Sequence, residues 1–483
     1  MSSKYIVGLD IGTTKIACFI GLRAENGKIQ IKGFGKTESV GVEHGIVRNI
    51  YDTANSIRRA VSDASEMANY DVEEVYVGIA GQHIKSRPNQ GSVMIAEDQR
   101  LIEKADVDRL IEEQNRIMLD PGEEIIHVFP QNYIVDNDKL ENDIDPVGVA
   151  GKCLMANFHI VTGNTMNLIN IHDSVERAGL KIKGVVLEPI ASAYAVLDNT
   201  DRDAGVALVD IGGGTTDIAI FHEGVIRHTT VLPLAGNAIT NDIKEGCKIL
   251  REQAETLKTR FGSCLPQNVS ENDIISIPGL RTQPPREISM RTLAGIIKAR
   301  TETILEQVDF EIKKSKLEKH IFAGIVLTGG GAQLRHIKEL TEFTTGIDTR
   351  IGLPNEHLDK DSDPEIINTM YATGIGLVIY CFRELDEKER HNQEIETETP
   401  AEPEPIAEPE PVKTTDEIFA EMPTQETTEP TVKKPKTTDN STPKTNKNKG
   451  KFGAQLMKSI DKYFGKVFGD DTIRNEGNEE QEL

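Results

Sequence analysis

Two kinds of apolar pattern alternate along the chain before about residue 384. Short runs rich in β-branched residues are typical of buried strands, and between them apolar residues recur with helical spacing. At 483 residues with 37% hydrophobic residues, the chain is long enough for two or more cores. The pattern therefore predicts a globular α/β protein with more than one core.

One strand-like run breaks into glycines and then resumes. "VDIGGGTTDIAIF" spans residues 209–221, and a near copy, "LDIGTTKIACFI", begins at Leu9, so Asp10 and Asp210 occupy matching places. A glycine-rich turn lets backbone N–H groups converge on phosphate oxygens, while an aspartate at the strand end faces a hydrated Mg²⁺. Two structural hairpins would explain the glycines but not the two matching aspartates. The predicted nucleotide-binding residues are Asp10, Gly12, Thr13, Thr14 and Lys15 in the first copy and Gly212, Gly213, Gly214, Thr215 and Thr216 in the second, with Asp10 and Asp210 as metal ligands.

A third glycine run, "GIVLTGGGAQLRHIKEL", follows the same logic. It predicts a buried strand, then Gly329, Gly330 and Gly331, then a helix whose N-terminus lies close to a bound nucleotide. Glycines join strands to helices in many α/β folds, so this run gains weight only as the third element in order.

The chain changes character near residue 384. The segment 384–450 is rich in Pro, Glu, Thr and Lys, has almost nothing apolar to bury, and is predicted to be a disordered linker. Segment 451–469 predicts a basic amphipathic helix, and 470–483 a disordered tail. The apolar face of the predicted helix 451–469 comprises Phe452, Leu456, Met457, Ile460, Tyr463, Phe464, Val467 and Phe468, and its basic face comprises Lys451, Lys458, Lys462 and Lys466. Such a helix fits an anionic membrane surface or a partner's groove; folding back on its own globular part is the alternative.

Overall composition limits the possible partners and compartment. A formal net charge of −23 disfavours a general nucleic-acid surface, and any membrane contact must be local. We find neither a leader nor a run of about 18 apolar residues, so we expect no membrane span. Five cysteines without a C-x-x-C pair predict buried thiols in a reducing cytoplasm rather than a disulfide framework or zinc site.

The phosphate loops, together with "LEPIASAYAVL", "VLTGGGAQL" and "YATGIGLVIY", resemble the motif set of the actin, Hsp70 and sugar-kinase superfamily over residues 4–383. Within it, "HVFPQNYIVD", "PLAGNAITNDI", "AETLKTRFG" and the terminal basic helix are most similar to the FtsA family of bacterial division proteins. This resemblance implies a two-lobed actin-like ATPase fold built from duplicated ribonuclease-H-like domains, with ATP and Mg²⁺ between the lobes.

The resemblance also implies a division of the chain. The expected parts are a first lobe from 1–81, 165–203 and 366–383, a second lobe from 204–235 and 322–365, an inserted α+β subdomain at 82–164, and a second small subdomain at 236–321. The inserted segment agrees in its own pattern, because "ADVDRLIEEQNRIM" predicts a helix between the alternating stretches "QGSVMIAE" and "EEIIHVFPQNYIVD". The lobe is expected to resume at the helix "TMNLINIHDSVERAGL".

By the same resemblance, Glu255 and Lys258 approach the adenosine. The second small subdomain would receive the C-terminal peptide of FtsZ, the tubulin-like division protein, with Lys298 and Arg300 pairing with its acids, although basic helix faces are usually just solvated. The family implies a scaffold at the division site, on the cytoplasmic side of the membrane, that polymerises, anchors FtsZ filaments and recruits later division proteins.

Catalysis is left open by the sequence. Glu188 and Asp210 are the candidate catalytic residues, and Asp217 is a further one, since hydrolysis needs a group that orients water and a metal that collects charge. Glu188 precedes Pro189 and is equally well placed to start a helix, whereas Asp217 also fits a solvent-facing edge. Weak ATP hydrolysis and ATP as a purely conformational ligand both remain compatible.

Two other functional classes share these loops. A sugar or small-acid kinase is the main alternative, but it has no use for a long tether that ends in a basic amphipathic helix. A chaperone ATPase of the Hsp70 type would need a β-rich peptide-binding domain where this chain has its Pro- and Glu-rich linker.

Overall fold

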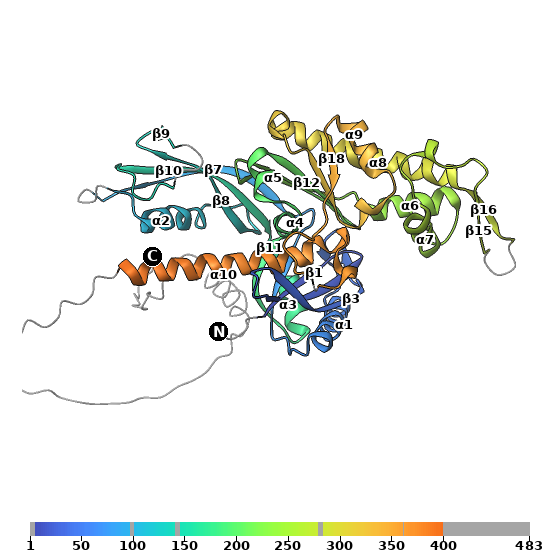
Figure 1. Cartoon of the computed structure of the whole chain (residues 1–483), viewed down its shortest axis with the longest axis horizontal. Coiled ribbons are helices and arrows are strands. Elements are labelled where there is room, and N and C mark those ends of the chain that lie inside the picture. The colour runs from blue at the N-terminus through green and yellow to red at the C-terminus, as the bar shows by residue number, and fades with distance from the viewer. Residues whose placement is uncertain (1–4, 97–100, 141–144, 279–283, 361, 399–483) are drawn as a thin grey trace, which may run out of the picture. The chain divides into compact units, whose positions relative to one another are not determined.

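Two five-stranded sheets form the frame of the protein in a computed structural model (Figure 1), which describes residues 5–96, 101–140, 145–278, 284–360 and 362–398. The first sheet has the order β11-β6-β1-β2-β3. Its strands are β1 (Ile6–Ile11), β2 (Lys15–Arg23), β3 (Ile29–Glu38), β6 (Glu74–Ile79) and β11 (Lys181–Leu187). The pairs β1–β2 and β2–β3 are antiparallel, and β1–β6 and β6–β11 are parallel.

The second sheet repeats this topology later in the chain. Its order is β14-β13-β12-β17-β18, from β12 (Val206–Ile211), β13 (Thr216–His222), β14 (Val225–Leu232), β17 (Ile325–Thr328) and β18 (Thr349–Ile351). Here too an antiparallel meander of three strands is extended by two parallel strands. Two sheets with the same order of strands confirm the predicted two-lobed fold with a duplicated core.

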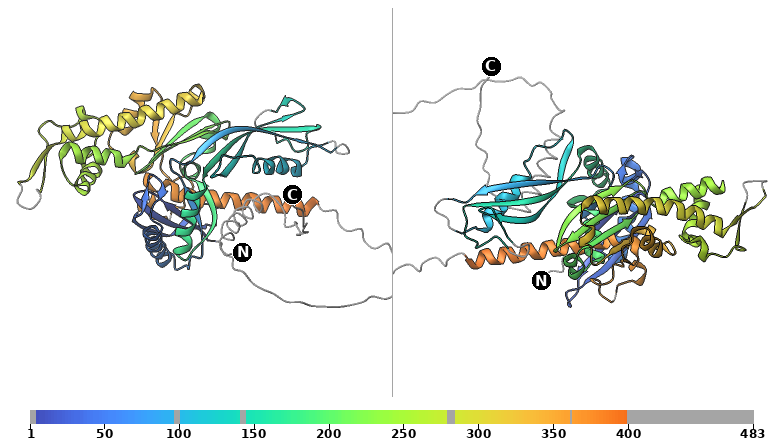
Figure 2. Two further views of the ribbon diagram at one scale, coloured as in Figure 1. Left: turned by 180° about the vertical axis from the view of Figure 1, so that it is seen from behind. Right: turned by 90° about the horizontal axis from the view of Figure 1, so that it is seen from above.

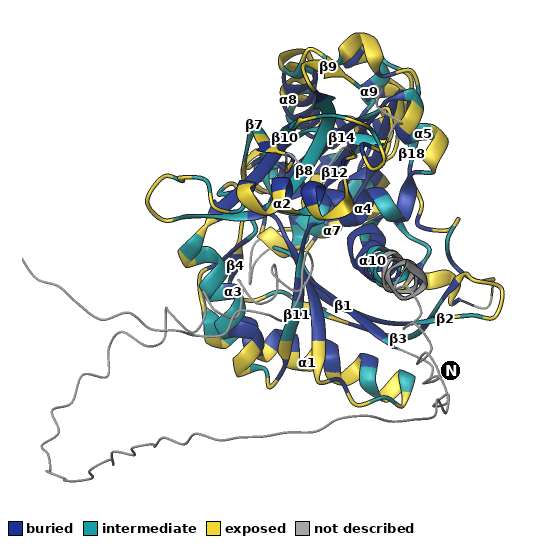
Figure 3. Ribbon diagram, turned by 90° about the vertical axis from the view of Figure 1, so that its left-hand side faces the viewer, coloured by how far each residue is buried: buried dark blue, intermediate teal, exposed yellow. Residues whose placement is uncertain are grey.

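Helices cover the first sheet. They are α1 (Ile50–Ala68), α3 (Thr165–Arg177), α4 (Glu188–Val196) and the start of α10 (Ala372–Glu398). The side chain of Asn49 caps α1 by accepting from the backbone N–H groups of Tyr51 and Asp52. Helix α1 can lie close to β3 because Gly35 has no side chain. A Cβ at Gly35 would lie 2.0 Å from the Ala60 carbonyl oxygen. Figure 3 shows β1 in the colour of buried residues and the outer side of α1 exposed.

A small α+β subdomain is inserted between β6 and α3. It contains β7 (Lys85–Met94), α2 (Lys104–Gln114), β8 (Glu123–Val135), β9 (Asp138–Lys139) and β10 (Cys153–Asn164), in the sheet order β7-β10-β8-β9. Both views of Figure 2 show its long strands running side by side. Leu110, Leu154 and Phe158 belong to its separate apolar core. Helix α2 and strands β7 and β8 lie where the apolar pattern predicts a helix between two alternating stretches.

A helical subdomain follows β14 in the second lobe. It contains α6 (Gly236–Cys247), α7 (Arg251–Phe261), the hairpin β15 (Ile274–Ile277) and β16 (Arg286–Ser289), and the long helix α8 (Met290–Ser315). Helices α6, α7 and α8 pack on the face of the second sheet that shares their apolar core. The first lobe has only α1 and the short strands β4 (Val42–Glu43) and β5 (Ile46–Val47) at the equivalent position in its topology.

Two shorter helices complete the second lobe: α5 (Asn199–Ala204), directly before β12, and α9 (Ile337–Thr345), between β17 and β18. Single 3-10 turns occur at Pro266–Asn268, Glu318–His320, Gly330–Gln333, Pro364–Ile366 and Thr369–Tyr371. None of the helices in the described part of the chain is both long enough and apolar enough to cross a bilayer.

The predicted start of the linker at residue 384 is wrong. Helix α10 continues to Glu398. The stretch "RELDEKERHNQEIETE" is polar, but Glu, Leu, Lys, Arg and Gln are good helix formers, and a polar helix needs no apolar partner to continue from a packed first half. The rest of the predicted linker, the basic amphipathic helix 451–469 and the tail lie outside the described residues.

Candidate functional site

The two aspartate–glycine turns have the same backbone structure. The Gly12 N–H donates to the Lys15 carbonyl at 3.0 Å, and the Gly212 N–H donates to the Thr215 carbonyl at 2.9 Å. Each turn joins two antiparallel strands, with Asp10 opposite Ala17 and Asp210 opposite Asp217. The repeated phrase in the sequence is therefore a repeated hairpin, one in each lobe.

The two hairpin turns approach each other closely. A Cβ at Gly213 would lie 1.8 Å from Thr14 Oγ1, and a Cβ at Gly214 would lie 2.4 Å from Thr13 Oγ1. A larger residue at Gly213 or Gly214 would therefore have to displace Thr14 or Thr13 of the first turn. The glycines are needed here for this close approach.

A cavity of about 310 Å³ opens between the hairpins. It is lined by nearly all of the residues predicted to bind nucleotide or metal or to act in catalysis: Asp10, Gly12, Thr13, Thr14, Lys15, Glu188, Asp210, Gly212, Gly213, Gly214, Thr215, Asp217, Glu255, Lys258, Gly329, Gly330 and Gly331. Residues that are more than 300 positions apart in the sequence thus meet around one space.

Thr216 is the exception among the residues predicted for the loops. It is fully buried in β13, and its hydroxyl donates to the Leu234 carbonyl at 2.7 Å. It does not line the cavity. Side chains alternate in direction along a strand, so Thr216 points away from the face that carries Thr215 and Asp217.

The third glycine run also lies at the cavity, but its local structure differs from the prediction. Gly329 has a φ of +84°, and a Cβ there would lie 2.3 Å from Asp210 Oδ1 and 2.5 Å from the Ile211 carbonyl oxygen. Gly330 and Gly331 then enter a short 3-10 turn, and α9 begins only at Ile337. Backbone of the 3-10 turn, rather than the N-terminus of a long helix, therefore faces the cavity.

The carboxylates at the cavity differ in how they are compensated. Lys15 Nζ contacts Asp10 Oδ2 at 2.6 Å. Burial alone would lower the pKa of Lys15, but Asp10, Asp210 and Glu188 outweigh it, so its pKa is raised and the lysine stays charged. The first hairpin therefore carries its own counter-charge.

For the other carboxyls at the cavity, burial is the largest cause of raised pKa values. It raises the pKa of Glu188 and of Asp217 well above their ordinary values, and their acidic neighbours add to both shifts. The Asp210 pKa is also raised by burial, although the hydroxyls of Ser192 and Thr373 counteract this. Within the described structure, the buried Oδ1 of Asp217 has no hydrogen-bond partner.

For Glu188 and for Asp217, the structure decides between the structural and the functional role that the sequence leaves open. Glu188 is the first residue of α4, with Pro189 behind it, and its side chain also lines the cavity, so it both starts a helix and faces the site. Asp217 is 4% exposed, which excludes a solvent-facing edge.

Lys258, on α7 of the helical subdomain, connects that subdomain to the second glycine turn. Its Nζ donates to the Gly236 carbonyl at 3.0 Å, to Thr240 Oγ1 at 2.8 Å and to Glu255 Oε2 at 2.8 Å. The Gly236 N–H in turn donates to the Gly212 carbonyl at 3.1 Å. Burial lowers the pKa of Lys258, against the opposing effect of Glu255.

Several lining residues were missed by the sequence reasoning: Gly45, Ala80, Gly236, Arg260, Gln333, Arg335, Met370 and Thr373. Arg260 and Thr373 fall inside the motifs "AETLKTRFG" and "YATGIGLVIY", so the motifs themselves pointed to both residues as candidates. Gly45 and Ala80 carry no such signal, because only the fold brings them to the cavity.

The predicted partner residues are engaged within the chain. Arg300 pairs with Asp242 through two hydrogen bonds of 2.6 and 3.1 Å. Lys298 Nζ lies 3.2 Å from Glu302 Oε1, one helical turn further along α8. An acidic peptide would have to compete with these carboxylates.

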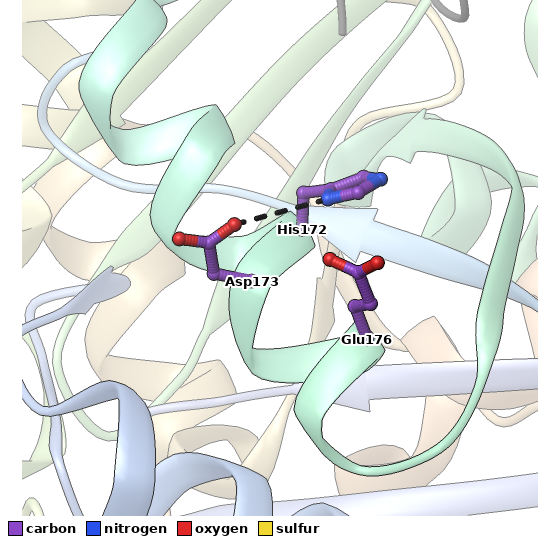
Figure 4. A group of neighbouring side chains, drawn as sticks. All are labelled: His172, Asp173 and Glu176. Carbon is purple, nitrogen blue, oxygen red and sulfur yellow. Dashed lines mark ion pairs between the residues drawn. The ribbon is translucent and has the colours of Figure 1, made fainter. Parts of the chain in front are cut away.

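Two other features stand apart from the cavity. His172, Asp173 and Glu176 lie together on α3 with partly or fully exposed side chains (Figure 4), and His172 Nδ1 is 4.0 Å from Asp173 Oδ1. Exposed acidic groups of this kind are common on helices. A second hollow, of about 420 Å³, lies over the sheet of the inserted subdomain, includes Gln131 and Arg227, and contains none of the predicted site residues.

Comparisons with known proteins agree with this architecture. A family model described as "SHS2 domain inserted in FTSA" matches residues 81–162, so the inserted subdomain has a known counterpart. "Cell division protein FtsA" matches residues 207–376, and "Hsp70 protein" matches residues 165–230. Among solved structures, the PilM–PilN type IV pilus biogenesis complex has a TM-score of 0.57 at 16% identity, covering 78% of this chain and 98% of that chain, which supports the actin-like fold alone.

Two curated relatives extend the similarity over most of the chain. Cell division protein FtsA of Pseudomonas aeruginosa is 38% identical over 379 residues, which cover 78% of this chain and 89% of the relative. Cell division protein FtsA of Escherichia coli K12 is 33% identical over 387 residues, which cover 78% and 90%. At this identity and coverage, the chain belongs to the FtsA family of actin-like cell division proteins.

Proposed function

We propose that this protein is an ATP-binding division scaffold in which Mg-ATP joins the two lobes. The observation that carries the proposal is the meeting of two equivalent aspartate–glycine hairpins, one from each lobe, at a single cavity. A ligand with several phosphates would contact both turns at once. Its binding would therefore favour a closed arrangement of the lobes.

The residues present fit Mg-ATP. Glycine turns leave room for phosphate oxygens near the backbone, and Asp10 and Asp210 are the residues that would hold the metal. Buried carboxyls with raised pKa values, and the unpartnered Oδ1 of Asp217, are what a bound cation would compensate. When bound, Mg²⁺ supplies positive charge against the phosphates. Glu255 and Lys258 also line the cavity, and by the family resemblance they would approach the adenosine.

We expect ATP turnover to be weak. A general base must be deprotonated to accept a proton from water, and burial raises the pKa of both Glu188 and Asp217, the two acids best placed to act. In the absence of Mg²⁺ and nucleotide, a larger fraction of molecules therefore carries these groups protonated. Slow hydrolysis is compatible with ATP acting mainly as a conformational ligand.

The scaffold function extends beyond the cavity. In our proposal the closed form polymerises head to tail through the inserted subdomain and the second lobe. The subdomain of α6, α7 and α8 receives the C-terminal peptide of FtsZ. The basic helix 451–469 attaches the polymer to the cytoplasmic face of the membrane at the division site, where later division proteins are recruited. Several weak helices acting together would give firm attachment.

Co-sedimentation with anionic liposomes tests this function. The full chain should bind cooperatively and more strongly with Mg-ATP than without it. Deleting residues 451–483 should abolish binding, while deleting only 470–483, which leaves the basic helix intact, should not. Membrane binding that survives the longer deletion would overturn the tether. Phosphoryl transfer from ATP to a sugar or small acid would instead favour the kinase alternative.

A further inference from the structure

Asp210 is held by two buried hydroxyls that the proposed chemistry does not yet use. Ser192 Oγ donates to Asp210 Oδ2 at 2.8 Å, and Thr373 Oγ1 donates to the same oxygen at 3.3 Å. The two hydroxyl oxygens lie 3.0 Å from each other. Ser192 is fully buried, and Thr373 and Asp210 are 8% and 7% exposed, so water competes little for these bonds.

The two hydroxyls come from the two segments by which the chain passes between the lobes. Ser192 lies on α4, which follows β11 of the first sheet and precedes β12 of the second. Thr373 lies at the start of α10, after the chain leaves β18 of the second sheet. Asp210 itself is on β12. The hydrogen bonds thus join both crossing segments to the carboxylate of the second hairpin.

The crossing segments also touch each other beside these hydroxyls. A Cβ at Gly376 would lie 1.8 Å from the Ala191 carbonyl oxygen, so α4 and α10 meet with no room for a side chain. Helix α10 continues onto the first sheet, where Gly374 packs against the ring of Phe19. Ser192 and Thr373 therefore lie beside the contact between the two crossing segments, where a change in the angle between the lobes would bear on their hydrogen bonds to Asp210.

The hydrogen bonds distinguish the two oxygens of Asp210. Both bonds go to Oδ2, whereas Oδ1 lies beside Gly329, which lines the cavity. Asp10, its counterpart in the first hairpin, is instead held by Lys15. The orientation of Asp210 depends on neutral hydroxyls from outside its own hairpin.

We propose that Ser192 and Thr373 are positioning residues that hold Asp210 Oδ2, present Oδ1 to magnesium–nucleotide, and make its binding depend on the contact between α4 and α10. This inference rests on the proposed nucleotide binding. In this proposal the hydroxyls act on the ligand through Asp210, although Thr373 also lines the cavity. Their loss should therefore weaken binding when Mg²⁺ is present and have little effect when it is absent.

The test uses the full-length protein and titrates ADP in Mg²⁺ and, separately, in EDTA. We expect Ser192→Ala and Thr373→Val each to weaken binding five- to tenfold in Mg²⁺ and less than twofold in EDTA. In Mg²⁺, the fold-loss of ADP affinity in the double variant should be smaller than the product of the two single fold-losses, because the two hydroxyls contact each other. Thr373→Ser keeps a hydroxyl and should stay within twofold of the unchanged protein.

Two matched controls separate positioning from stability. Ser174 on α3 and Thr341 on α9 are also fully buried, and their hydroxyls donate to the carbonyls of Asn170 and Ile337. Ser174→Ala and Thr341→Val should leave binding unchanged in both buffers. If Ser192→Ala does not fold, Thr373→Val carries the test alone.

Three results would count against the inference. Unchanged affinity in both variants would overturn it, as would equal losses in Mg²⁺ and EDTA. If the unchanged protein itself fails to bind ADP with Mg²⁺, the proposed function fails, and this inference fails with it.

Discussion

The two hairpins share a backbone and differ in charge. Lys15 in the first turn occupies the place of Thr215 in the second, and Ala17 occupies the place of Asp217. The first hairpin therefore pairs its aspartate with a lysine of its own, whereas the second adds another buried carboxyl. The turn therefore has the same shape in both lobes. The second hairpin, however, carries two buried carboxyls, Asp210 and Asp217, and no lysine that would balance them. Changes at the residues that differ between the hairpins, Lys15 and Asp217, should therefore have different effects.

The largest effect is expected where the hairpins meet. In Gly214→Ala the new Cβ would lie 2.4 Å from Thr13 Oγ1 and 2.9 Å from Thr13 Cβ, so the turns must separate. Overpacking of this kind costs about 2 kcal/mol. Because the cost falls on the arrangement in which both turns contact the nucleotide, we expect a roughly 30-fold loss of Mg-ADP affinity. Calorimetric titration measures it. Gly295→Ala on α8, where a Cβ meets nothing within 4 Å, is the matched control and should bind normally.

A smaller effect is expected from removing the lysine that distinguishes the first hairpin. Lys15→Met keeps the length of the side chain but leaves Asp10 without its partner at 2.6 Å. Breaking a partly buried pair should lower the free energy of unfolding by about 2 kcal/mol and weaken Mg-ADP binding about tenfold. Chemical denaturation and titration measure the two losses. Lys32→Met on β3 is the control, and equal effects from both variants would contradict a special role for Lys15.

The smallest effect concerns the extra carboxyl of the second hairpin. A raised folded-state pKa means that Asp217 stabilises the fold at low pH and loses that contribution as pH rises through the raised pKa. Asp217→Asn should therefore raise the ligand-free free energy of unfolding at pH 7–8 by about 1 kcal/mol and flatten its decline with pH.

Denaturation curves between pH 5 and 8 measure this change. Asp63→Asn on the exposed side of α1 should not alter the pH dependence. If Asp217→Asn were less stable than the unchanged protein at pH 8, the ionised Asp217 carboxylate would be stabilised by its surroundings in the ligand-free fold, and the prediction would be wrong.

Much of the fold and the cavity could be predicted because they depend on short, local patterns. The aspartate–glycine phrases predict turns that bind phosphate, and the resemblance that these phrases and the other motifs carry implies the duplicated lobes. Thr216 could not be excluded from the loop set, because the side that a threonine faces depends on where the strand begins. The contacts of Ser192 and Thr373 with Asp210 were also not predictable, since they join three elements that only the tertiary fold brings together.

The extent of α10 shows a different limit. Polar, charged sequence after residue 384 is compatible both with a linker and with a solvated helix that continues a packed one. The deciding fact is that its first half is anchored, for example by Leu377 and Val378 in the first core. Composition alone does not contain that information.

The most direct test is whether the two hairpins form one shared nucleotide site. Calorimetric titration of Mg-ADP should be done on the unchanged protein, on Asp10→Asn and on Asp210→Asn. The account predicts one nucleotide per chain and a loss of at least about tenfold in both variants, because each aspartate serves the same ligand. Two sites per chain, or a variant of either aspartate that binds as the unchanged protein does, would contradict it.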